Sequence, residues 1–125
     1  MTVAAAIRIT SADEDRVIKD AVDFARQQNM PCFVIAIVSK LPYGEVNEEH
    51  RDAVVRNLEL IAELEASPVM KEGSDIATSL LAVAQGFGVR TMFLQSGTSR
   101  LLGRSIAEQL LYLNPPFDVV VVSSE

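Results

Sequence analysis

The sequence predicts a single doubly wound α/β domain, in which a parallel five-stranded sheet carries helices on both faces. Five short apolar stretches alternate along the chain with four stretches of helical periodicity. The last apolar stretch, FDVVVV, is an almost unbroken run typical of a strand covered on both faces. Alternating strands and helices require right-handed crossovers, which produce a parallel sheet. We expect the strand order 3-2-1-4-5.

Length and composition indicate one folded domain over residues 1–125, since this length builds one sizeable core but not two. Hydrophobic residues make up 49% of the chain, and the net charge of −6 argues against nucleic acid as a partner. No apolar run reaches the roughly 20 residues that span a bilayer, so direct membrane insertion is not expected. A single cysteine and no basic leader favour the cytoplasm.

The first predicted strand is Ala4–Thr10, and the second is the buried run Cys32–Val38. Between them, Asp13–Gln28 has apolar residues at helical spacing and is predicted to be a helix. Its acidic first turn suits the positive end of the helix dipole, and Ser11 or Asp13 is expected to cap it.

The middle of the chain adds a loop, a long helix and a short strand. Leu41–Val46 is a loop, as its proline and glycine indicate. Asn47–Ala66 is a helix capped by Asn47, with an apolar side and a charged side. Ser67–Lys71 is a weak strand that contains a proline, which fits an edge position.

The last third of the chain contains two further helices and two further strands. Residues 73–88 form a helix with a strong apolar stripe that ends in glycines, and Val89–Leu94 is the fourth strand. Apolar residues recur at helical spacing over residues 102–113, and two prolines then stop the helix. Phe117–Val122 is the fifth strand. We expect one residue of each long strand to be almost fully buried: Ile9, Ile35, Phe93 and Val120.

A ligand site is expected where the strand order reverses, between the first and fourth strands. There the loops around Thr10–Asp13 and Gln95–Arg100 should face each other across a crevice. The second loop offers amides, hydroxyls and two arginines before a helix, a combination that can hold a phosphate. The alternative is that these residues only turn the chain and cap the helix. The candidate site residues are Thr10, Ser11, Asp13, Ser96, Gly97, Thr98, Ser99, Arg100, Arg104 and Ser105.

Nothing in the sequence builds a catalytic centre, so we expect no enzyme activity. No cysteine–histidine pair, GxSxG turn or Walker A loop is present, and His50 is the only histidine, which argues against a metal site. A receiver domain of the same fold class would need an aspartate ending the third strand and a lysine ending the fifth. SPVMKEG and VVVVSSE supply neither.

Two segments resemble the universal stress protein family, and the resemblance covers nearly the whole chain. GSDIATSLLAVAQGFGVRTMFLQS is similar to that family's third helix and fourth strand, and RSIAEQLLYLNPPFDVVVV is similar to its last block. The resemblance implies a flavodoxin-like fold. Nucleotide-binding members carry G-x-x-G-x9-G-[ST] after the fourth strand and an aspartate ending the first. Here the first strand ends without aspartate, although Asp13 follows, and Arg104 stands where the last glycine is expected.

The variant is similar to the stress-protein-like domain of potassium-sensing histidine kinases, with Ser11 after the first strand and an Arg/Ser-rich loop after the fourth. Related domains occur on the cytoplasmic ends of some transporters, and some members bind a cyclic dinucleotide. The resemblance therefore implies a non-catalytic signalling module with a degenerate nucleotide crevice, belonging to a larger kinase or transporter. Its ligand would be an adenine nucleotide or a cyclic dinucleotide. The alternatives are an ATP/AMP-binding universal stress protein and a purely structural dimerisation domain.

The fifth strand is placed at an edge of the sheet, and its segment Phe117–Ser123 contains no lysine or proline that would oppose pairing. The family resemblance also implies pairing through the last strand. We therefore expect a homodimer in which Val119 and Val121 meet their counterparts about a two-fold axis.

Overall fold

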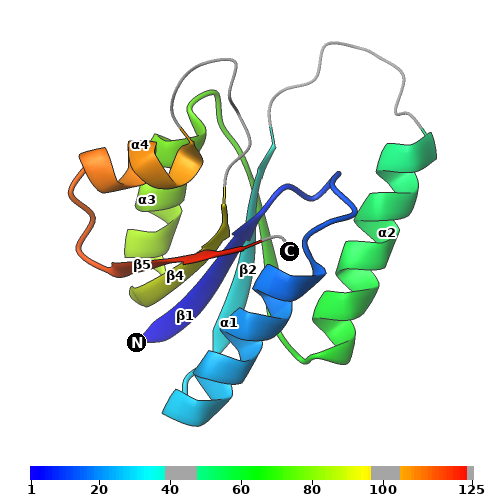
Figure 1. Ribbon diagram of the computed structural model, residues 1–125, viewed down its shortest axis with the longest axis horizontal. Coiled ribbons are helices and arrows are strands. Elements are labelled where there is room, and N and C mark those ends of the chain that lie inside the picture. The colour runs from blue at the N-terminus through cyan, green and yellow to red at the C-terminus, as the bar shows by residue number, and fades with distance from the viewer. Residues whose placement is uncertain (39–47, 97–104, 124–125) are drawn as a thin grey trace.

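The computed structural model describes residues 1–38, 48–96 and 105–123. In this part of the chain strands and helices alternate strictly, as the sequence predicts (Figure 1). The elements are β1 (Thr2–Ile7), α1 (Asp15–Gln28), β2 (Cys32–Val38), α2 (Glu48–Glu63), β3 (Ser67–Glu72), α3 (Ile76–Gly86), β4 (Val89–Gln95), α4 (Ile106–Tyr112) and β5 (Asp118–Val122). The predicted loop Leu41–Val46 and the predicted cap Asn47 lie outside the described residues.

The five strands form one parallel sheet in the order β3-β2-β1-β4-β5, which confirms the predicted doubly wound topology. Helices α1 and α2 cover one face, and α3 and α4 cover the other (Figure 1). Central strand β1 pairs with two neighbours, so that Ala5 lies between Val34 of β2 and Phe93 of β4. The side chains of β1 are all buried, because helices cover both of its faces.

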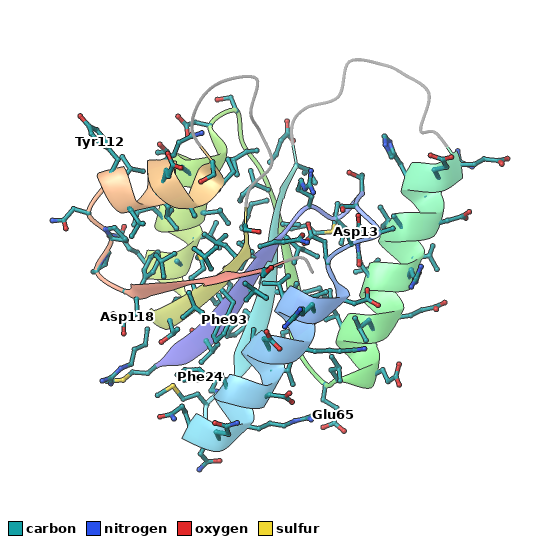
Figure 2. The ribbon with its side chains drawn as sticks, viewed as in Figure 1. Asp13, Phe24, Glu65, Phe93, Tyr112 and Asp118 are labelled. Atoms are coloured by element: carbon teal, nitrogen blue, oxygen red, sulfur yellow. The ribbon has the colours of Figure 1, made fainter. Side chains whose placement is uncertain are left out.

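The core has one apolar cluster on each face of the sheet. On the face that α1 covers, Val17, Ile18 and Ala21 of this helix pack with side chains of β1 and with Phe93 of β4. The ring of Phe24 on α1 lies tilted against that of Phe93, with 5.5 Å between their centroids (Figure 2). On the opposite face, α3 and α4 bury side chains such as Leu80 and Leu110 against the sheet.

Three of the four residues expected to be almost fully buried are buried: Ile9, Ile35 and Phe93. The prediction for Val120 is wrong, because this side chain is 36% exposed. The neighbouring Val121 is 50% exposed, so β5 is not covered on both faces as its valine run suggested. The physical reason is its edge position: α1 packs mainly over β1 and β4, and the short α4 leaves much of the last strand open.

The first strand and the first helix differ from their predicted bounds. β1 ends at Ile7, because a turn follows in which the Ser11 amide donates to the Arg8 carbonyl at 3.0 Å. Helix α1 then begins at Asp15. Its N-cap residue is Glu14, not Ser11 or Asp13, and the Glu14 side chain does not cap the helix. These differences define the β1–α1 turn, residues 8–14. None of the helices in the described ranges is long and apolar enough to cross a membrane.

Candidate functional site

The candidate site lies at the edge of the sheet where the carboxyl ends of β1 and β4 meet. The two strands are adjacent and parallel, with Ala6 opposite Leu94, so the segments that follow them begin side by side. This is the reversal point of the strand order, where ligands bind in open parallel sheets. Of the predicted site residues, the structure describes Thr10, Ser11, Asp13, Ser96 and Ser105. The others lie outside the described residues: Gly97, Thr98, Ser99, Arg100 and Arg104.

The β1–α1 turn exposes Thr10 and Asp13, while Ser11 is half-buried. Asp13 is labelled on this turn in Figure 2. The Ser11 hydroxyl accepts a hydrogen bond from the Asp13 amide at 3.3 Å, so it bonds within the turn. The turn presents to solvent the hydroxyl of Thr10, the carboxylate of Asp13 and the guanidinium of Arg8.

Asn57 of α2 fixes the same turn from a different element. Its side-chain amide, 2% exposed, donates to the Ile9 carbonyl at 2.9 Å and to the Ser11 carbonyl at 3.0 Å. The sequence analysis did not identify this residue. The available signal was its spacing, because Asn57 lies four residues from each of Ala53 and Ile61, which are the buried apolar residues of α2. A polar residue in such a buried stripe needs an internal hydrogen-bond partner.

Glu14 closes the turn from its other end. Its carboxylate does not bond to the amides of α1 but accepts a hydrogen bond from the Arg8 amide, 2.9 Å from Oε1. The residue is 2% exposed, and its second oxygen, Oε2, is buried without a hydrogen-bond partner in the structure. The Arg8 guanidinium Nε lies 3.6 Å from Oε1, but the Arg8 side chain is 66% exposed. Solvent therefore screens this ion pair.

Burial raises the pKa of the Glu14 carboxyl group above its ordinary value of 4.5. The Arg8 amide and guanidinium oppose this increase by stabilising the ionised form, and the nearby charge of Asp13 adds to it. Glu14 was also missed as a site residue, although Val17 and Ile18 follow it at helical spacing and place it on the buried face of the helix. From the sequence, its negative charge is explained by the helix dipole alone.

On the β4 side, Ser96 and Ser105 are bonded to the protein itself. The Ser96 amide donates to the Val122 carbonyl at 2.8 Å, which extends the pairing of β4 with β5. The Ser105 hydroxyl caps α4 by accepting from the Glu108 amide at 3.1 Å. Gln95, the last residue of β4, has a buried Oε1 atom without a hydrogen-bond partner in the structure. Ser105 therefore caps the helix, as the alternative to a phosphate site expects for this residue.

The described part of the site can offer hydrogen bonds, the Asp13 carboxylate and the exposed Arg8 guanidinium to a ligand. Within residues 1–38, 48–96 and 105–123, no group of three or more acidic, histidine or cysteine side chains is arranged to hold a metal ion. Helix α4 has only seven residues, so its amino end contributes little dipole. The described backbone donor on the β4 side, the Ser96 amide, is already engaged.

Comparison of the sequence with family models and with curated proteins finds no match. Comparison of the structure finds universal stress proteins. One solved in complex with cAMP has a TM-score of 0.73 and 14% identity, covering 100% of this chain and 98% of that one. The protein from Archaeoglobus fulgidus has a TM-score of 0.70 and 16% identity, covering 97% of this chain and 92% of its own.

A universal stress protein from Archaeoglobus fulgidus in complex with dAMP has a TM-score of 0.65 and 19% identity, covering 97% of this chain and 96% of its own. These likenesses establish the flavodoxin-like α/β fold that universal stress proteins share. They extend over the whole sheet and all four helices, and so include the edge at which the β1–α1 turn lies.

Proposed function

We propose that this domain is a non-catalytic regulatory module for stress-response signalling, built on the universal stress protein fold and carrying a degenerate nucleotide crevice. We further propose that it is the cytoplasmic sensory domain of a larger kinase or transporter. This second proposal is supported by a resemblance to the stress-protein-like domain of potassium-sensing histidine kinases. The resemblance lies in Ser11 and in the segment around Ser105.

The observation that carries the proposal is that polar groups at the crevice are bonded to the protein itself. The Ser96 amide is bound by Val122, and the Ser105 hydroxyl is bound by Glu108. On the other side, the Ser11 hydroxyl accepts from Asp13. A phosphate requires free donors that converge on it. The Ser96 amide is already engaged, whereas each serine hydroxyl only accepts in these bonds and keeps its own proton to donate. We expect weak nucleotide binding, because the Ser96 amide is not available to a phosphate.

The second candidate function is that of an adenine-nucleotide-binding universal stress protein. It is favoured by two of the similar structures, which hold cAMP and dAMP respectively. In this chain, the exposed Thr10 hydroxyl and Asp13 carboxylate are available to a ribose or a base. A cyclic dinucleotide is the remaining ligand class, on the resemblance to the kinase-associated domains.

A thermal-shift screen with ATP, AMP, cAMP and cyclic dinucleotides, followed by calorimetry, tests the proposal. We expect ATP to bind more weakly than about 100 μM, equivalent to about −5.5 kcal/mol. Micromolar ATP affinity that is lost in Ser105→Ala would contradict the degenerate crevice and favour the second candidate. Thr10→Val serves as a matched variant, because it removes an exposed hydroxyl from the opposite loop while keeping its shape.

The proposed module pairs with a second copy of itself through β5. Val121 is 50% exposed and Val119 is half-buried, so this edge combines apolar side chains with unpaired backbone groups. Leu111 and Tyr112 are also exposed at the end of α4, from which Tyr112 projects outward (Figure 2). Pairing of two such edges would remove this apolar surface from water.

A further inference from the structure

We propose that Glu14 is a proton-dependent tether, which holds the β1–α1 turn against the sheet while its carboxyl group is protonated and releases it on ionisation. The turn carries Thr10, Ser11 and Asp13, so the proposal gives this face of the crevice two states. It goes beyond the proposed function and does not depend on it, since no ligand takes part.

The first support is the position of the carboxyl group. Glu14 lies at the amino end of α1, where an acidic side chain usually bonds to the first amides of the helix. Here it turns inward, is 2% exposed, and bonds instead to the Arg8 amide at 2.9 Å. This one side chain therefore joins the two ends of the turn. If Glu14 leaves its buried position, the Arg8 amide loses its partner.

The second support is a pair of buried oxygen atoms without partners. In its ionised form Glu14 Oε2 is a hydrogen-bond acceptor with nothing to accept, and Gln95 Oε1 is in the same position. Gln95 follows Phe93 by two residues on β4, so strand alternation places it on the face that α1 covers. Gln95 thus lies at the carboxyl end of β4, on the face of the sheet that α1 covers, and Glu14 is the N-cap residue of α1. A proton on Oε2 turns this acceptor into a donor, so the protonated carboxyl group leaves one fewer buried acceptor without a partner.

The third support is the weakness of the compensating charge. Among the described residues, Arg8 forms an ion pair with Glu14, and solvent screens its guanidinium. Asp13 is also close, and its negative charge disfavours the ionised form of Glu14. The strand residues at this end, Ile7 and Gln95, are uncharged.

Helix α2 supplies no free compensating charge either. It faces the turn with the neutral Asn57 and with Arg56, whose guanidinium lies 3.7 Å from the Asp15 carboxylate. An ionised carboxylate buried with one screened partner is costly, so ionisation favours the arrangement in which Glu14 reaches water.

Asn57 limits how far the turn moves. Its two hydrogen bonds hold the carbonyls of Ile9 and Ser11, and neither depends on pH in this range. The release is therefore confined to the contact between Arg8 and Glu14 and to Asp13 beside it. Ionisation moves the exposed carboxylate of the crevice while the middle of the turn stays in place.

Amide hydrogen exchange and carboxyl-carbon NMR titration of the ligand-free protein test the proposal between pH 4.5 and 8. The Glu14 carboxyl group should titrate above 4.5. After correction for intrinsic exchange, the protection factor of the Arg8 amide should fall as the pH rises. The fall should be about tenfold for each unit by which the pKa of Glu14 in the tethered turn exceeds its pKa in the released turn. The Glu108 amide, which is bonded to the uncharged Ser105 hydroxyl, is the internal control and should not follow this change.

Two variants separate the tether from general effects of charge. Glu14→Gln keeps an oxygen for the Arg8 amide and replaces the other with a permanent donor, so Arg8 protection should be high and independent of pH. Asp13→Asn removes the exposed carboxylate next to it and should keep the pH dependence. The proposal is wrong if Arg8 protection in the unmodified protein does not change with pH, or if Glu14→Gln shows the same change. If Glu14→Gln does not fold, a Glu14 carboxyl titration at or below 4.5 in the unmodified protein refutes it.

Discussion

The side-chain amide of Asn57 donates to the carbonyl oxygen of Ile9 at 2.9 Å, and thereby joins α2 to the turn that follows β1. The same nitrogen also serves Ser11, so one buried amide satisfies two carbonyls of a loop. Buried backbone carbonyls need such partners. The position of the candidate site therefore depends on a helix from which the sequence analysis drew no site residue.

Replacement of Asn57 by alanine should destabilise the fold. It leaves two carbonyl oxygens without their donor, which costs on the order of 1–3 kcal/mol of unfolding free energy. Urea denaturation followed by circular dichroism measures this loss. Gln27→Ala, on the exposed side of α1, is the control and should change the unfolding free energy by less than about 0.5 kcal/mol. An equal effect of both variants would contradict the role of Asn57.

Replacement of Glu14 by glutamine should change how stability depends on pH. Because burial raises the pKa of Glu14 in the folded state, its contribution to stability is fully present below its unfolded pKa, near 4.5, and is lost as the pH rises through the folded pKa. The unfolding free energy of the unmodified protein should therefore fall relative to that of Glu14→Gln between pH 4.5 and 8. Urea denaturation at a series of pH values measures the difference. A difference that is constant over this range would show that Glu14 is not perturbed.

Truncation of Val120 should cost less than truncation of Phe93, although the two residues are partners in the register of β4 and β5. Phe93 is buried beneath α1, so Phe93→Ala should cost about 3–5 kcal/mol. Val120 is 36% exposed and leaves no closed cavity, so Val120→Ala should cost about 1 kcal/mol or less. Equal losses in thermal or urea denaturation would contradict the exposure of Val120 and mean that its side chain is buried in solution.

Introduction of a charge on β5 should separate the proposed dimer. Val121→Lys places an ammonium group on an exposed apolar position of the edge strand, where it opposes pairing with a second copy. Light scattering at tens of micromolar should show a dimer for the unmodified protein and a monomer for this variant. Val55→Lys on α2 makes the same change at a position that is 54% exposed and distant from β5; it should remain dimeric. A monomeric unmodified protein would rule out this interface.

The sequence was sufficient to predict the topology, because the alternation of apolar and helical stretches allows few arrangements of the chain. It failed at Val120, since an unbroken valine run is compatible both with a covered strand and with a partly exposed edge. Composition cannot distinguish the two; the distinction depends on how far α1 and α4 extend over the sheet.

At the site, sequence reasoning identified exposed hydroxyl and acidic residues such as Thr10 and Asp13, but missed the residues that position them. Asn57 acts on a turn 46 or more positions away in the chain, a relationship that local periodicity does not contain. Glu14 was recognised as an acidic residue at a helix start. Its inward rotation follows from the contact with the Arg8 amide, which only the tertiary structure defines.

The bond between Asn57 and the β1–α1 turn also bears on the order in which the chain matures during synthesis. Strand β1, helix α1 and strand β2 are complete by Val38, so they can associate early on the basis of local contacts. The carbonyls of Ile9 and Ser11 nevertheless remain without their donor until residue 57 has been made and α2 has docked. A nascent chain can thus pair β1 with β2 before the turn after β1 is fixed. A fragment that ends at β2 would contain the predicted residues of the turn without the Asn57 donor that holds its carbonyls.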